Sequence, residues 1–159
     1  MHSVLILALG IGFVAGLRSM TAPALVCWAA HLQWIHLQGT PLSFMGSSIA
    51  VAIFTLAAIG ELVADKLPKT PARTAPGPLI VRIVMGALCG ACLYAAAAAT
   101  PIIGAIPGAI GAVIGTFAGY HIRHAVVTKL GVKDTFVAVT EDIITIVLAY
   151  SIVHSVISY

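Results

Sequence analysis

The sequence predicts an all-α polytopic membrane protein with about five transmembrane helices, forming a single domain over residues 1–159. Three observations support this fold class. Hydrophobic residues make up 60% of the chain and charged residues 8%, against roughly 45–50% and 25% in soluble domains. The mean hydropathy is +1.09. Apolar runs of about 20 residues, long enough to cross a hydrocarbon core of about 30 Å, recur along the chain.

The predicted spans cover residues 3–30, 47–66, 79–99, 102–122 and 135–157. We interpret the first as a span, and not as a signal peptide, because no Lys or Arg precedes its apolar stretch. That stretch continues to about Ile35 and contains Pro23, which removes a backbone donor, next to the hydroxyls of Ser19 and Thr21. We therefore expect the first helix to be interrupted, with a single tilted helix as the alternative.

Basic residues predict the orientation of these spans. By the positive-inside rule, loops rich in Lys and Arg are cytoplasmic. The loops after the first and third spans contain no Lys or Arg, whereas those after the second and fourth contain Lys66, Lys69, Arg73, Arg82, Arg123, Lys129 and Lys133. The predicted location is a bacterial inner membrane, with the N-terminus in the cytoplasm and the C-terminus outside. Trp28 and Trp34 then lie toward the outer interface.

The fourth span repeats features of the first. Residues 12–16 (GFVAG) precede Arg18, and residues 115–119 (GTFAG) precede Arg123. With five crossings, half-repeats 1–78 and 102–159, linked by span 79–99, would insert in opposite senses, as in many secondary transporters. The glycines of 104–119 form small-residue faces that allow close helix contact. We favour contacts within the bundle, and the sequence leaves a homo-oligomer open.

Charged residues at membrane depth are the strongest functional signal. Each costs about 2.5–3.5 kcal/mol on insertion scales, so such residues face one another, a hydrated cavity or a ligand. The guanidinium of Arg18 suits a carboxylate or phosphate, whether of a substrate or of a structural ion pair. The predicted substrate- or ion-binding residues are Arg18, Ser19, Thr21, Glu61, Asp65, Arg123, Glu141 and Asp142.

The acidic residues occur as two close pairs with different geometries. Glu61 and Asp65 lie four positions apart on one helical face. Close carboxylates in a low-dielectric setting resist joint ionisation, which favours proton coupling, although Asp65 could also be solvated beside Lys66. Glu141 and Asp142 are adjacent and point about 100° apart on a helix, so they cannot share one partner. We expect one of them in the interior and the other at the cytoplasmic edge.

Other motifs carry weaker signals. Lys69, Arg73 and Arg82 are predicted contacts for lipid head groups, although topology alone accounts for their charges. Cys89 and Cys92 form a C-x-x-C motif without a neighbouring His or acid, which favours ordinary packing over a metal or redox role. The basic residues cluster in two loops and form no stripe, so a nucleic-acid partner is not expected. No cofactor, metal site or nucleophile–base set is evident, and we expect no enzyme.

Three segments, 16–24 (GLRSMTAPA), 61–68 (ELVADKLP) and 70–74 (TPART), resemble a family of small bacterial integral membrane proteins known mainly as a domain of unknown function. The resemblance implies a membrane location and no established activity.

The function expected from the residues is a secondary transporter or channel-like permease for a small solute. In its most specific form, the hypothesis is that the solute is an anion and that its transport is coupled to protons. The alternatives are a lipid-handling protein, either a flippase or a head-group binder, and a non-transporting scaffold. A cavity shared by Arg18, Glu61 and Glu141 would favour the permease.

Overall fold

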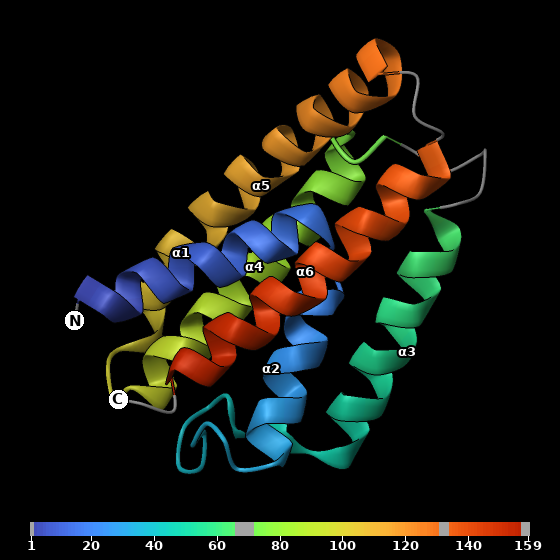
Figure 1. The fold of residues 1–159 in the computed structure, drawn as a ribbon. Helices are drawn as coiled ribbons and strands as arrows, with labels where there is room; N and C mark the ends of the chain where they lie inside the picture. The colour runs from blue at the N-terminus through green and yellow to red at the C-terminus, as the bar shows by residue number, and fades with distance from the viewer. Residues whose placement is uncertain (1, 66–71, 131–133, 157–159) are drawn as a thin grey trace.

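The computed structural model describes residues 2–65, 72–130 and 134–156, and within them the chain is all-helical. Figure 1 shows the helices in one bundle. Their bounds are α1 His2–Leu17, α2 Thr21–His31, the 3-10 helix η1 Ser43–Gly46, α3 Ser48–Ala64, α4 Pro76–Ala96, α5 Pro101–Leu130 and α6 Asp134–Val156.

Three of the described helices are long and apolar enough to cross a membrane, which supports the predicted membrane class. These spans are Pro76–Ala96, Pro101–Lys129 and Phe136–Val156, and α1 and α3 are shorter apolar helices. The predicted count of five spans is not reproduced. Two predicted spans are missing from these three: residues 3–30 form two helices, α1 and α2, and residues 47–66 contain α3, which has 17 residues.

The interruption predicted in the first span is present, and it turns the chain around. α1 runs antiparallel to α6: Gly10 lies against Ile152 and Arg18 pairs with Asp142. After α2, the ring of Trp34 lies 6.0 Å from that of Tyr150, back toward the C-terminal end of α6. α2 therefore returns along the bundle in the direction opposite to α1, as Figure 1 also shows.

This reversal contradicts two expectations from the sequence. α1 and α5 run parallel, because Gly12 packs on Gly108 and Gly16 packs on Gly115, so the proposed half-repeats 1–78 and 102–159 are not inverted. The beginning of α1 and the end of α6 lie at the same end of the bundle (Figure 1), whereas five crossings would separate them. Hydropathy registers an apolar run but not a change of direction within it.

Backbone contact between glycines holds α1, α4 and α5 closely together. A Cβ atom placed on Gly108 would overlap the Gly86 carbonyl of α4, and one placed on Gly12 of α1 would overlap the Gly108 carbonyl. Small residues at such crossings let helices approach until their backbones touch. The glycine faces are therefore used within the bundle, as the sequence analysis favoured.

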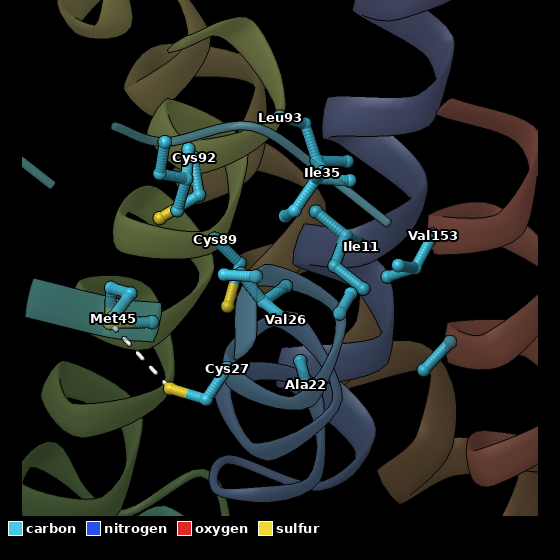
Figure 2. Close-up of a cluster of buried hydrophobic side chains, with 14 of the residues drawn as sticks. Ile11, Ala22, Val26, Cys27, Ile35, Met45, Cys89, Cys92, Leu93 and Val153 are labelled. Atoms are coloured by element: carbon cyan, nitrogen blue, oxygen red, sulfur yellow. Dashed lines mark hydrogen bonds between the residues drawn. The ribbon is translucent and has the colours of Figure 1, made fainter. Parts of the chain in front are cut away.

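A cluster of buried apolar side chains fills the interior where α2 packs against its neighbours. Figure 2 shows that it draws on several elements, including Ile11 of α1, Val26 of α2 and Val153 of α6. Cys27 Sγ lies 3.8 Å from Met45 Sδ. Cys89 and Cys92 are free thiols buried in the same cluster, so the C-x-x-C motif occupies packing positions.

α3 lies at the edge of the bundle and buries little apolar surface. Its buried residues are Ala50 and Val51 in the first turn. Near there, Trp28 of α2 donates a hydrogen bond to Thr55 Oγ1 at 3.0 Å. The large exposed side chains of α3 are apolar, as expected for lipid contact, and comprise Ile49, Ile53, Leu56, Ile59 and Val63. The opposite end of α3 contains Glu61, has Asp65 as its C-cap, and approaches the bundle through polar contacts.

Candidate functional site

All four arginines and all five acidic residues of the chain lie near the end of the bundle opposite the beginning of α1, seven of them in one connected network of ion pairs and Glu61 with Arg82 as a pair beside it. The α1–α2 turn, the loop before α4 and helices α3 to α6 each contribute at least one member. We call this set the charged cluster: Arg18, Glu61, Asp65, Arg73, Arg82, Arg123, Asp134, Glu141 and Asp142. It contains one more carboxylate than guanidinium groups.

The break between α1 and α2 is stabilised on both sides by side chains from other helices. The last carbonyls of α1 have no partners within the helix, and Arg82 Nη1 donates to those of Gly16 at 2.7 Å and Leu17 at 2.8 Å. At the start of α2, Glu61 accepts from the backbone N–H groups of Ser19 and Met20, both at 2.8 Å. The signs match the helix dipole, with the cation at the C-terminus and the anion at the N-terminus.

Local sequence explains why the helix breaks at this point. Met20 is the N-cap of α2 and provides no side-chain cap, so an acceptor must come from elsewhere in the chain. The Ser19 hydroxyl adds a third hydrogen bond to Glu61, at 2.7 Å. Pro23 lies in the first turn of α2, where its missing N–H costs no helical hydrogen bond. Pro23 therefore helps to begin a second helix and does not kink a continuous one.

Arg18 is the most deeply buried member of the charged cluster. Its side chain is 0% exposed, and it pairs with Asp65 of α3 and Asp142 of α6. The Nε groups of Arg18 and Arg82 are buried and bond to no acceptor among the described residues. Because buried polar groups are nearly always hydrogen-bonded, these two donors give the cluster capacity for a further oxygen ligand.

Arg73 and Arg123 extend the network toward α5 and α6. Arg73 binds both carboxylate oxygens of Glu141, at 2.5 and 2.9 Å. Arg123 donates to both oxygens of Asp134, at 2.8 and 2.7 Å. Its Nη1 lies farther from Asp65, at 3.5 Å, and from Glu141, at 3.7 Å.

The structure brings together seven of the eight predicted substrate- or ion-binding residues. Thr21 is the exception: it is buried at the first position of α2 and is not part of the charged cluster. Glu141 and Asp142 pair with different arginines, as their angular offset predicted. Both side chains are 11% exposed, so their exposure does not distinguish an interior acid from one at the cytoplasmic edge, and the expectation of one at each place stays a prediction.

The residues predicted to contact lipid head groups lie elsewhere than expected. Arg73 and Arg82 are buried in the charged cluster, because the carbonyls ending α1 and the carboxylate of Glu141 provide stronger partners than an exposed loop would. Lys69 lies outside the described residues.

Sequence reasoning missed two residues at this site. Asp134 begins α6 and pairs with Arg123, but in sequence it is an ordinary acid at a helix start. Thr116 is buried within the GTFAG segment. Its hydroxyl donates to the carbonyl of Ala112 at 2.7 Å and lies 3.3 Å from that of Gly16. In the sequence, the one signal for Thr116 was the position of its hydroxyl within a glycine-rich apolar segment.

A lateral groove adjoins one side of the charged cluster. It lies between α5 and α6, has a volume of about 390 Å³ and is floored by Phe13 and Leu17 of α1. Arg123 and Glu141 line it, but Arg18 and Glu61 do not. This groove is therefore not the cavity shared by Arg18, Glu61 and Glu141 that the permease hypothesis anticipated.

Residues 5–157 match a family model described as "Domain of unknown function (DUF4126)". The matched region includes all nine residues of the charged cluster and both sides of the α1–α2 break. No curated protein and no solved structure matches the chain.

Proposed function

We propose that this chain, which belongs to the DUF4126 family of unknown function, is a bacterial inner-membrane permease for a small anionic solute. One observation carries the proposal: the carboxylate of Glu61 lies at the first N–H groups of a discontinuous helix. In transporters with broken helices, such N-termini hold the anionic group of the substrate. Glu61 would act as an internal ligand that the substrate replaces.

The chemistry around Glu61 suits such an exchange. The donors are the N–H groups of Ser19 and Met20, the Ser19 hydroxyl and, at 3.5 Å, Arg82 Nη2. They would bind a solute carboxylate in the same way, and replacing one carboxylate by another leaves the local charge unchanged. The Nε groups of Arg18 and Arg82, which bond to no acceptor in the described part of the chain, are further donors for an anion, and a guanidinium suits phosphate as well as carboxylate.

The same exchange would move α3. The buried residues of α3, Ala50 and Val51, lie at its far end, and Glu61 and Asp65 connect its last turns to the rest of the bundle. Rearranged salt bridges are a common basis of switching between two conformations. In this proposal, substrate binding releases Glu61, and α3 then opens the charged end of the bundle.

The basic loops indicate which side of the membrane the charged cluster faces. Applied to the observed helix directions, the positive-inside rule supports a cytoplasmic charged cluster. The beginning of α1 and the end of α6 would then face outward. Relative to the orientation expected from sequence, only the N-terminal side changes, because the chain reverses its direction after Arg18.

Uptake of radiolabelled phosphate and acetate into proteoliposomes tests the proposal. Wild-type vesicles should take up at least one of these anions faster than protein-free vesicles. In Glu61→Gln the internal competitor is weakened, so the half-saturating anion concentration should fall about tenfold, equivalent to about 1.4 kcal/mol. Gly60→Ala is the matched control, because a Cβ at Gly60 meets no atom within 4 Å, and its uptake should equal that of the wild type.

Two results would overturn this function. One is uptake no faster than in protein-free vesicles with folded wild-type protein; the other is an unchanged half-saturation in Glu61→Gln. A parallel assay of fluorescent-phospholipid translocation separates the alternatives. Lipid translocation without anion uptake would favour the lipid-handling hypothesis, and the absence of both would favour a scaffold. Repeating the uptake with an imposed pH gradient tests proton coupling.

A further inference from the structure

We infer that the groove between α5 and α6 binds one phospholipid with an ethanolamine head group. An acyl chain would lie in the groove, the phosphate on Arg123 and the ammonium on Asp134. This site goes beyond the proposed transport function, because the lipid is a bound partner and not the solute. The inference depends on the membrane orientation of α5 and α6 and not on any flux.

The dimensions of the groove suit a single acyl chain. Its lining on α6 extends from Phe136 to Leu148, a length of about 18 Å at about 1.5 Å per residue. Half of a hydrocarbon core of about 30 Å is about 15 Å, so the groove has the length of one leaflet. Its volume of about 390 Å³ falls within the range of roughly 300–1,000 Å³ found for small-molecule sites.

The groove opens on a surface where lipid is the natural neighbour. α5 and α6 both have the length and apolarity of membrane spans. Ile122, Phe136 and Ile144 line the groove and are exposed at its mouth. Phe13 and Leu17 of α1 close its floor. An acyl chain entering from the bilayer would thus contact three helices, α1, α5 and α6.

The charged groups beside the groove distinguish a specific site from general lipid contact. Arg123 lines the groove and has the most exposed side chain of the four arginines, at 17%. Its main partner, Asp134, is 58% exposed. Exposed ion pairs contribute little to stability, so a lipid phosphate can take one of the two positions that Asp134 holds on the guanidinium. Two further carboxylates lie near Arg123, at 3.5 Å for Asp65 and 3.7 Å for Glu141. Each has a nearer arginine, because Arg18 pairs with Asp65 and Arg73 binds both oxygens of Glu141.

The same ion pair favours ethanolamine over other head groups. Arg123 and Asp134 present a positive and a negative group next to each other, which complements a phosphate followed by an ammonium. An ethanolamine ammonium has three N–H donors for the released Asp134 oxygen, whereas a choline head group has none and a glycerol head group has no positive charge. Hydrogen bonds between charged groups are the stronger class.

Native mass spectrometry of the detergent-solubilised protein tests the inference. The protein is titrated with phosphatidylethanolamine, phosphatidylcholine or phosphatidylglycerol of identical acyl chains. We expect one phosphatidylethanolamine to be retained at a concentration at least fivefold lower than either of the others. Ile144→Trp fills the groove and should abolish retention. Ile143→Trp adds the same bulk at the neighbouring exposed position, which does not line the groove, and should retain the lipid.

Asp134→Asn tests the head-group assignment separately. The Asp134→Asn variant should still retain one lipid, but it should bind phosphatidylethanolamine and phosphatidylcholine about equally. Circular dichroism confirms that each variant is helical. Equal retention of all three lipids by the wild type would overturn the inference, as would indistinguishable behaviour of the two tryptophan variants or an unchanged preference in Asp134→Asn. None of these outcomes depends on anion uptake.

Discussion

α5 and α3 are held in the same bundle by different forces. α5 packs through glycines whose neighbours are backbone atoms of α1 and α4. α3 buries Ala50 and Val51 at one end, and at the other it is held by the carboxylates of Glu61 and Asp65. Backbone contacts between glycines require one specific arrangement of the helices. A carboxylate can exchange its partners for water or for another anion, so we expect motion at α3 and rigidity at α5.

The largest effect should come from removing the cation that connects α3 to α6. Arg18→Met leaves Asp65 and Asp142 without their main buried partner, which should lower the free energy of unfolding by about 3–5 kcal/mol. Denaturation in mixed detergent micelles measures this. Adding Asp142→Asn to the same variant should restore part of the loss. A loss below about 1 kcal/mol for Arg18→Met would mean that water replaces the pair at little cost.

Substitutions of two glycines compare the packing of α5 and α3 directly. Gly108→Ala places a Cβ against the Gly86 carbonyl and should cost about 1–3 kcal/mol through overpacking. Gly60→Ala meets no atom within 4 Å and should stabilise α3 by about 0.5–1 kcal/mol, because glycine is unfavourable within a helix. The same denaturation assay measures both. Equal effects at the two positions would contradict the proposed difference in packing.

Hydrogen exchange should detect the weaker attachment of α3. In Glu61→Gln, the backbone N–H groups of Ser19 and Met20 lose a charged acceptor. Their exchange, and that of the last turn of α3, should accelerate about tenfold, equivalent to about 1.4 kcal/mol. Exchange in residues 108–119 of α5 should not change. Faster exchange in both regions would indicate that the two helices open together.

The smallest effect should come from the exposed Arg123–Asp134 pair. The hydrogen bond from Arg123 lowers the pKa of Asp134 below its ordinary value. Such a group stabilises the fold above its unfolded pKa of about 3.9, and the contribution is lost as the pH falls through the lower folded value. Asp134→Asn should therefore cost about 0.2–1 kcal/mol at pH 7. The difference should disappear in acid, as unfolding measured over a pH series would show.

The sequence predicted the membrane class and the composition of the charged site more successfully than the path of the chain. Charges at membrane depth must find partners, so Arg18 and the acids of the later spans could be selected without knowing the fold. The direction of α2 could not be predicted, because it depends on Glu61 and Arg82 satisfying the backbone near residues 16–20. Both lie more than 40 positions away along the chain.

The backbone groups at the α1–α2 turn are capped by Glu61 and Arg82, which lie far away in sequence, and this has a consequence for biogenesis. During synthesis, the carbonyls of Gly16 and Leu17 enter the membrane long before Arg82 of α4 is made, and the N–H groups of Ser19 and Met20 enter before Glu61. Unsatisfied backbone groups are costly in hydrocarbon, so the N-terminal hairpin should remain near the interface until α4 inserts. Chains arrested before Arg82 emerges should therefore integrate poorly and be degraded faster than chains that include α4.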